Sequence, residues 1–161
     1  MILVFGSINV DLIVPVPHLP EPGETVLGGD YALLPGGKGG NQALAAHRAG
    51  AAVMLAGAVG MESFADIALD LLRREGIDTR LVRVVAQPTG CAAIMVSSEG
   101  ENLIAVASGA NASVRSDQVD DDLLGASTTL VTQMEVPPGE TEILIRRVRA
   151  RRPKIPQRSC S

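Results

Sequence analysis

Short apolar segments recur along this chain and are separated by longer segments in which apolar and polar residues mix. Residues 2–5 and 52–58 are continuous apolar runs of the length of a β-strand. Strands that are buried on both faces of a parallel sheet have this uninterrupted apolar pattern. A further strand is predicted over residues 129–134, ending at Glu135. These runs predict a central parallel sheet.

The segments between these runs contain predicted helices. The first is rich in alanine, follows a glycine-rich stretch and has Gly50 as its C-terminal stop. The second begins at Ser63, where Ser63 and Asp66 have the spacing of a capping box, and ends before Gly76. The predicted helices span residues 41–49, 63–75, 117–124 and 140–149.

Two pairs of weaker strands interrupt this alternation. Residues 12–16 and 25–33 alternate weakly around a proline-rich turn, and residues 91–96 and 103–107 flank the polar turn 97–101. Strands that alternate with helices, with two hairpins inserted, predict an α/β fold. We therefore expect a parallel sheet flanked by helices, together with a small second β-sheet.

Composition limits the kinds of function. The 161 residues are 46% hydrophobic, which is enough for one domain with a core. Only 2% are aromatic and the net charge is −4, so we expect no nucleic-acid partner. No apolar run has the length of a membrane span, and Asp11 interrupts the apolar N-terminal segment too early for a signal peptide. A cytoplasmic location without a membrane partner is expected.

The cysteines and histidines form no metal-binding or catalytic pattern. Cys91 and Cys160 are far apart and belong to no C-x-x-C pair, so no metal site is predicted. Cys91 lies in an apolar strand, where a small packing role is expected. Neither His18 nor His47 has a partner pattern, and neither is assigned to catalysis.

The sequence GGKGGN at residues 36–41 is the strongest chemical signal. A phosphate-binding P-loop needs Ser or Thr after its lysine, but Gly39 follows Lys38. A dinucleotide fingerprint also fails, because Gln42 occupies the position of its third glycine. Four glycines in six positions suit a close approach of ligand to backbone. A glycine-rich turn without chemical function is the alternative.

Polar residues follow the predicted strands and are expected to converge. Asn9 and Asp11 come just after the first strand, and Glu135 follows the strand that ends at Met134. Ligands of open α/β sheets bind beyond the carboxyl ends of the strands. Carboxylates and amides beside the free N–H groups of a helix suit a polyhydroxylated ligand. Taken singly, Asp11 or Glu135 could instead be a helix cap or a solvated surface charge.

The sequence resembles the ribokinase-like (PfkB) carbohydrate kinases, and most of all their ribokinase branch. The glycine run, with Ala43, Gly50 and Gly60, matches the first signature of that family. The matching motifs are GSINVD at 6–11, PGET at 22–25, GGKGGNQA at 36–43, PTG at 88–90, GEN at 100–102, GAN at 109–111 and QMEVP at 133–137. The resemblance covers about residues 1–145. It implies a ribokinase-like, Rossmann-like sheet with a β-sheet lid built from residues 12–33 and 90–108.

The resemblance also implies an activity and a set of site residues. In this family a hydroxymethyl oxygen of a sugar attacks the γ-phosphate of ATP, with Mg²⁺ and often a monovalent cation. The lid covers the sugar and often forms a homodimer contact. The implied sugar-binding residues are Asn9, Asp11, Gly37, Lys38, Gly39, Gly40, Asn41 and Glu135. The alternatives are a non-catalytic sugar-binding or dimerisation module, and a fragment of a nucleoside kinase or another sugar kinase of the family.

The resemblance stops near residue 146. The family's catalytic aspartate, its G-A-G-D motif and its nucleotide pocket belong to a C-terminal half that this sequence does not contain. We therefore expect no catalytic residue, weak binding of ATP and Mg²⁺, and no kinase activity of the chain alone. Residues 146–161 carry seven basic and no acidic side chains. This tail is interpreted as truncated or out of frame, and a polyanion-binding arm is the alternative.

Overall fold

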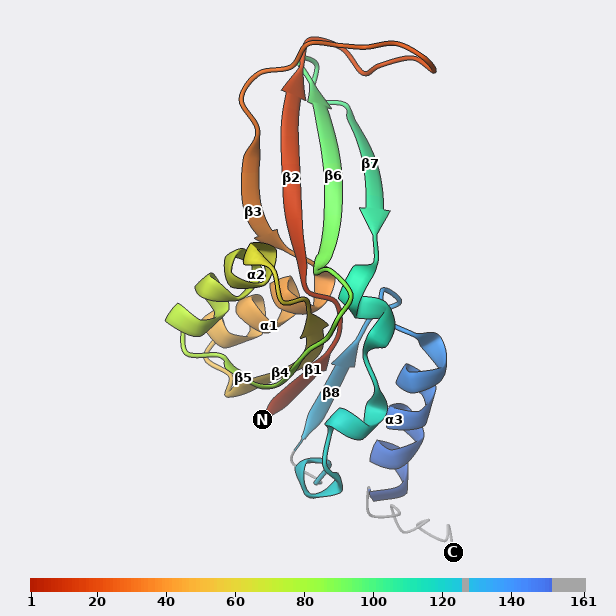
Figure 1. The fold of residues 1–161 in the computed structure, drawn as a ribbon. Coiled ribbons are helices and arrows are strands. Elements are labelled where there is room, and N and C mark those ends of the chain that lie inside the picture. Colours follow the sequence, from red (N-terminus) through yellow and green to blue (C-terminus); the bar gives the residue numbers. More distant parts are fainter. Residues whose placement is uncertain (126–127, 152–161) are drawn as a thin grey trace, which may run out of the picture.

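A four-stranded parallel sheet in the order β5–β4–β1–β8 forms the body of the protein (Figure 1). The computed structural model describes residues 1–125 and 128–151. The strands are β1 Ile2–Phe5, β4 Val53–Val59, β5 Asp78–Val84 and β8 Thr129–Thr132. The strands predicted at 2–5, 52–58 and 129–134 are thereby confirmed with small shifts of their ends. The parallel sheet of the expected α/β fold is also confirmed.

Alternate residues of the central strands supply two separate cores. Leu3 and Phe5 of β1 point to one face, which α3 (Pro138–Arg151) covers together with residues 110–124. Val4 points to the other face, which α1 (Lys38–Arg48) and α2 (Ser63–Arg74) cover. Every residue of β4 is buried. A strand covered on both faces by helices has this continuous apolar sequence.

A second sheet, in the order β3–β2–β6–β7, rises from the carboxyl edge of the first (Figure 1). Its strands are β2 Asn9–Val16, β3 Ala32–Gly36, β6 Gly90–Ser97 and β7 Asn102–Ala107. The outer pairs β2–β3 and β6–β7 are antiparallel, and β2 and β6 pair in parallel. This sheet is called the lid sheet below. It confirms the predicted second sheet.

The lid strands differ in their bounds from the prediction. β2 begins at Asn9 rather than at residue 12. β3 spans Ala32–Gly36, so it overlaps only the end of the predicted segment 25–33 and extends beyond it. Asn9 pairs with Gly36 at the base of the lid, so both strands extend down to the body. Asn9 and Asp11 therefore follow β1, as predicted, and they lie in the first part of β2, which the predicted strand 12–16 did not include.

The glycine stops were predicted correctly, but the capping box was not. Gly50 and Gly76 follow α1 and α2 with φ of 91° and 84°, a conformation that glycine adopts without strain. Helix α2 begins at Ser63, but its N-cap is Glu62 and no side chain caps it. Ser63 is already the first helical residue, so its side chain is not in the N-cap position that a capping box requires.

Two other segments also differ from the prediction. Residues 117–124 form two short 3₁₀ turns, η2 Ser116–Gln118 and η3 Asp121–Leu123, instead of one helix. The backbone is extended at Val119 between them, where this side chain enters the core. Strand β5 was not predicted, because an edge strand with charged residues lacks a continuous apolar run.

Helix α3 extends across the boundary that the sequence analysis placed at residue 146. It begins at Pro138, before the predicted Glu140, and ends at Arg151. Residues 146–151 of the predicted tail are therefore helical, and residues 152–161 lie outside the described residues. None of the helices in the described part of the chain has the length and hydrophobicity that a membrane span requires.

Candidate sugar-binding site

The predicted site residues lie at the junction between the lid sheet and the body. Asn9 opens β2, Gly36 closes β3, and α1 begins directly afterwards at Lys38. Glu135 lies in the segment between β8 and α3. The turn between β1 and β2 runs beneath them and contacts the first turn of α1. Elements that are remote in sequence thus meet at the carboxyl edge of the body.

The Asn9 side chain is fixed by a second asparagine. Asn9 is 4% exposed, and its Oδ1 accepts a hydrogen bond of 2.7 Å from Nδ2 of Asn111. Asn111 also accepts a bond of 2.9 Å from the Ile8 N–H and donates one of 3.2 Å to the Ile8 carbonyl. Because Oδ1 is engaged, the amide NH₂ of Asn9 is the group left to donate to a ligand. Asn111 belongs to the GAN motif, but its sequence did not indicate this role.

Asp11 lies against the backbone of Gly36. A Cβ at Gly36 would come within 2.2 Å of Asp11 Oδ1, so a larger residue here would displace the Asp11 carboxylate. Partial burial raises the pKa of Asp11, and the negative charge of Glu135 raises it further. The effect of Glu135 on the pKa of Asp11 shows that the two carboxylates lie close enough to interact, and the prediction expected them to converge.

The glycines of the run make close contacts within the protein. Gly37 has φ of 87°, and a Cβ there would lie 2.7 Å from the Asn9 nitrogen. A Cβ at Gly39 would lie 2.6 Å from the backbone of Gly6. Gly39 and Gly40 are buried, whereas Lys38 and Asn41 are exposed. The glycines let α1 approach the β1–β2 turn, while the side chains of Lys38 and Asn41 reach the surface.

Lys38 and Glu135 form an ion pair across the site. The Lys38 ammonium pairs with Oε1 of Glu135, and the Lys38 backbone N–H donates to Oε2 at 3.4 Å. Ser7 Oγ donates to the same Oε2 at 2.6 Å. Partial burial alone would raise the pKa of Glu135, but the bonds from Lys38 and Ser7 outweigh it and hold this pKa below its usual value. Glu135 is therefore an anion at neutral pH.

The first turn of α1 offers no free donors to a phosphate group. Gly39 N–H donates to Ser7 Oγ at 3.4 Å, and Gly40 N–H donates to the Ser7 carbonyl at 3.0 Å. The Asn41 N–H donates to the Gly37 carbonyl at 2.9 Å. The site does not fit a nucleotide phosphate at this helix end. An amide donor, two carboxylates and an ammonium at one rim instead suit the hydroxyl groups of a sugar.

The described residues 1–125 and 128–151 contain no group of three or more histidine, cysteine or acidic side chains arranged to hold a metal ion. Cys91 is half-buried in β6, and burial raises the pKa of its thiol, which the negative charge of Asp11 raises further. Cys160, the other cysteine of the sequence, lies outside the described residues.

A parallel sheet, a second β-sheet that rises from its carboxyl edge and polar residues at the junction form the architecture that the resemblance to the ribokinase-like kinases implies. The sequence profile of the pfkB family carbohydrate kinases matches residues 1–152, and the chain belongs to this family. A ribokinase of Haemophilus influenzae is 39% identical over 143 residues, which cover 87% of this chain and 47% of that protein. A ribokinase of Bacillus subtilis is 42% identical over 110 residues, covering 68% and 38%.

Solved structures give the same result. A ribokinase from Giardia lamblia superposes with a TM-score of 0.83 at 33% identity, covering 92% of this chain and 46% of that one. An Arabidopsis thaliana ribokinase complexed with ribose and ATP superposes with a TM-score of 0.81 at 29% identity, covering 92% and 50%. The chain thus spans about half the length of the relatives that it matches.

Proposed function

We propose that this chain is the sugar-recognising part of a ribokinase-type carbohydrate kinase. The whole protein would transfer the γ-phosphate of ATP to a hydroxymethyl group of a pentose such as ribose. The observation that carries this proposal is the meeting of Asn9, Asp11, Lys38 and Glu135 at one rim beneath the lid. The names of the matched relatives, and the ribose and ATP in one of them, support it.

Each polar residue of the rim has a role in this proposal. The Asn9 amide donates to a sugar hydroxyl, and the Asp11 carboxylate accepts from one. Lys38, Asn41 and Glu135 contact the sugar from the opposite side, since the ion pair can exchange hydrogen bonds with a hydroxyl that both donates and accepts. Gly37, Gly39 and Gly40 place these groups by allowing α1 to start against the lid base.

We propose further that the 161-residue chain does not transfer phosphate by itself. In the whole protein, ATP would supply the phosphoryl group, with Mg²⁺ and a monovalent cation as cofactors. Phosphoryl transfer depends on groups that position and neutralise the phosphates. The N–H groups of α1 are already bonded within the protein, and the sequence contains no G-A-G-D motif. A coupled ADP-release assay with ribose, ATP and Mg²⁺ should show no turnover, and turnover would contradict this proposal.

The sugar itself is tested by ligand-induced thermal stabilisation, because a ligand that binds only the folded state raises the melting temperature. Millimolar ribose should raise it more than 2-deoxyribose, inosine or glucose. Stabilisation by inosine but not by ribose would favour the nucleoside-kinase alternative. Absence of stabilisation by every sugar would contradict the proposal.

We also propose that the lid sheet mediates a homodimer, and that the whole protein works in the cytoplasm. The lid carries exposed apolar side chains on β7, of which Ile104 and Val106 point to one face that a partner lid would cover. Sedimentation equilibrium should show a dimer that Ile104→Lys disrupts. A monomer at all concentrations would contradict the dimer.

Cell fractionation tests the proposed location. The whole protein should be found in the cytoplasmic fraction, and its recovery in another fraction would contradict the proposal.

A further inference from the structure

The hydroxyl of Ser7 connects three elements of the site. Ser7 lies in the turn between β1 and β2 and is 0% exposed. Its Oγ donates to Glu135 Oε2 at 2.6 Å and accepts from the Gly39 N–H at 3.4 Å. Its carbonyl accepts from the Gly40 N–H at 3.0 Å. One buried residue therefore bonds both to the first turn of α1 and to a carboxylate that is 128 positions away in the sequence.

Besides the Ser7 bond, the bonds to the Glu135 carboxylate among the described residues come from Lys38, through its ammonium and, at 3.4 Å, through its backbone N–H. Glu135 lies in a short irregular segment, and its neighbour Met134 is 76% exposed. Its ion-pair partner Lys38 has a side chain that is 65% exposed. The exposed Lys38 side chain is free to move in water, so the ion pair contributes little fixed geometry. The bond from Ser7 comes instead from a buried hydroxyl whose position is fixed, and it goes to an ionised acceptor.

We propose that Ser7 is a positioning residue for sugar recognition, which holds the Glu135 carboxylate at the N-terminus of α1 and thereby orients the Lys38–Glu135 pair toward the ligand. This inference rests on the proposed function. It adds to the site a residue, Ser7, that is not among the proposed sugar contacts. Ser7 acts through Glu135, because its own hydroxyl is fully buried and already bonded on both sides.

The bond has a spectroscopic consequence. Ser7 stabilises the ionised form of Glu135, so its removal moves the titration of that carboxyl toward its ordinary range. The charged groups that act on this titration among the described residues are the Lys38 ammonium and the Asp11 carboxylate. Both remain in a Ser7 variant. A change in the Glu135 midpoint therefore reports the lost hydroxyl.

The test is a ¹³C NMR titration of side-chain carboxyls in the free protein, with Glu135 assigned by Glu135→Gln. In Ser7→Ala the Glu135 midpoint should move to higher pH. Ser116→Ala is the matched control, because the buried Ser116 hydroxyl donates to Glu140 Oε2 at 2.7 Å away from the site. This control should move Glu140 and leave Glu135 unchanged. An unchanged Glu135 midpoint in Ser7→Ala would overturn the proposal.

A second variant and a second readout keep the test decisive. If Ser7→Ala does not fold, Ser7→Cys retains a weaker donor and should give a smaller shift of the same sign, whereas no shift would overturn the proposal. By calorimetry, Ser7→Ala should bind ribose about threefold to tenfold more weakly than the wild type. Equal affinity would overturn the role in recognition. If the wild type binds no ribose, the proposed function fails, while the NMR titration still decides whether Ser7 positions Glu135.

Discussion

At the scale of single residues, buried polar side chains and close glycines hold the candidate site. Asn111 bonds to Asn9, and Ser7 bonds to Glu135, so two of the proposed sugar contacts are each held by a second, buried residue. A Cβ at Gly90 would lie 2.2 Å from Asn9 Oδ1, which makes this glycine part of the same arrangement. The polar groups of the candidate site are thus oriented by contacts within the protein.

Substitution of Gly37 tests whether the glycine run is required by packing. Gly37→Ala combines an unfavourable φ of 87° with a Cβ placed 2.7 Å from the Asn9 nitrogen. We expect a loss of about 3 kcal/mol in the free energy of unfolding, measured by urea denaturation. Gly50→Ala is the control, because φ is 91° and no atom lies within 4 Å. It should lose only about 1 kcal/mol. Equal losses would contradict a packing role.

The two carboxylates predict opposite effects of pH on stability. The pKa of Glu135 is held below its ordinary 4.5, so its stabilising effect is present above that pH and disappears as the pH falls through the lowered pKa. The pKa of Asp11 is raised above 3.8, so its charge destabilises the fold at neutral pH and protonation relieves this.

Urea unfolding from pH 7 to pH 3 measures these effects. The stability advantage of the wild type over Glu135→Gln should shrink as the pH falls. The deficit of the wild type relative to Asp11→Asn should shrink over the same range. Parallel pH profiles for the wild type and both variants would contradict the assignment.

At the scale of elements, the sequence predicted best those segments whose pattern is local. Strands β1 and β4 are continuous apolar runs, and Gly50 marks the end of α1 through its own conformation. Two other features depend on contacts with remote elements. Strand β5 forms by pairing with β4, and the helical turns break at Val119 because its side chain is buried in the core. Local patterns could not reveal either.

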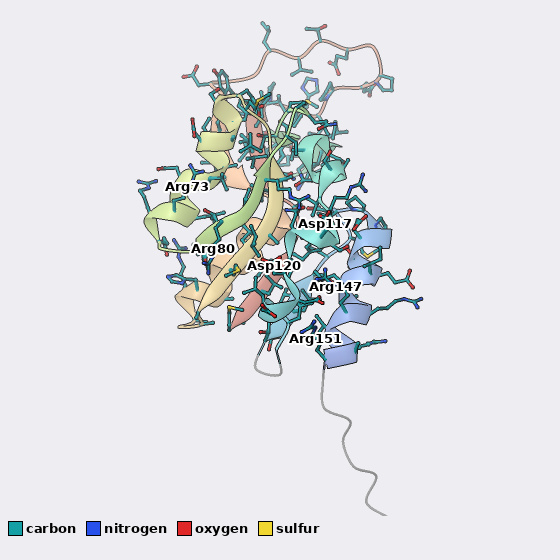
Figure 2. All side chains as sticks on the ribbon, turned by 60° about the horizontal axis from the view of Figure 1, so that its bottom comes forward. Arg73, Arg80, Asp117, Asp120, Arg147 and Arg151 are labelled. Atoms are coloured by element: carbon teal, nitrogen blue, oxygen red, sulfur yellow. The ribbon has the colours of Figure 1, made fainter. Side chains whose placement is uncertain are left out.

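Helix α3 shows how long-range contacts extend an element. Arg147 donates to the carbonyls of Ser116 at 2.7 Å and Val119 at 2.6 Å, and it pairs with Asp121. Arg151 pairs with the same aspartate. Figure 2 shows both arginines on the side of α3 near the η2–η3 segment. Two basic residues of the predicted tail, Arg147 and Arg151, thus connect α3 to the η2–η3 segment.

This role can be measured by comparing two adjacent arginines. Arg147→Ala removes bonds to two backbone carbonyls and a carboxylate, and should lower the free energy of unfolding by about 2 kcal/mol. Arg146→Ala should change it by less than about 0.5 kcal/mol, because Arg146 is 76% exposed and pairs with Glu142 on its own helix. Chemical denaturation of both variants gives the comparison. Similar losses would show that Arg147 does not anchor η2–η3.

At the scale of the whole molecule, the site exists because two sheets meet. The sequence placed polar residues just after the predicted strands, and the family resemblance predicted which of them bind a sugar. It could not show that Asn9 and Asp11 belong to the lid, since this depends on the pairing of Asn9 with Gly36 and Gly90. The sequence also could not reveal the bond between Ser7 and Glu135, because only the fold brings these two residues within hydrogen-bond distance.

The central claim is that this chain by itself carries the sugar-recognising half of a carbohydrate kinase. Isothermal titration of ribose into the wild type and into Asp11→Asn tests it most directly, because Asp11 is a proposed sugar contact and its raised pKa indicates that its charge is unfavourable in the free protein. The account predicts saturable binding by the wild type and a loss of at least about tenfold in affinity for the variant. No heat with the wild type at millimolar ribose, or equal binding by both proteins, would contradict it.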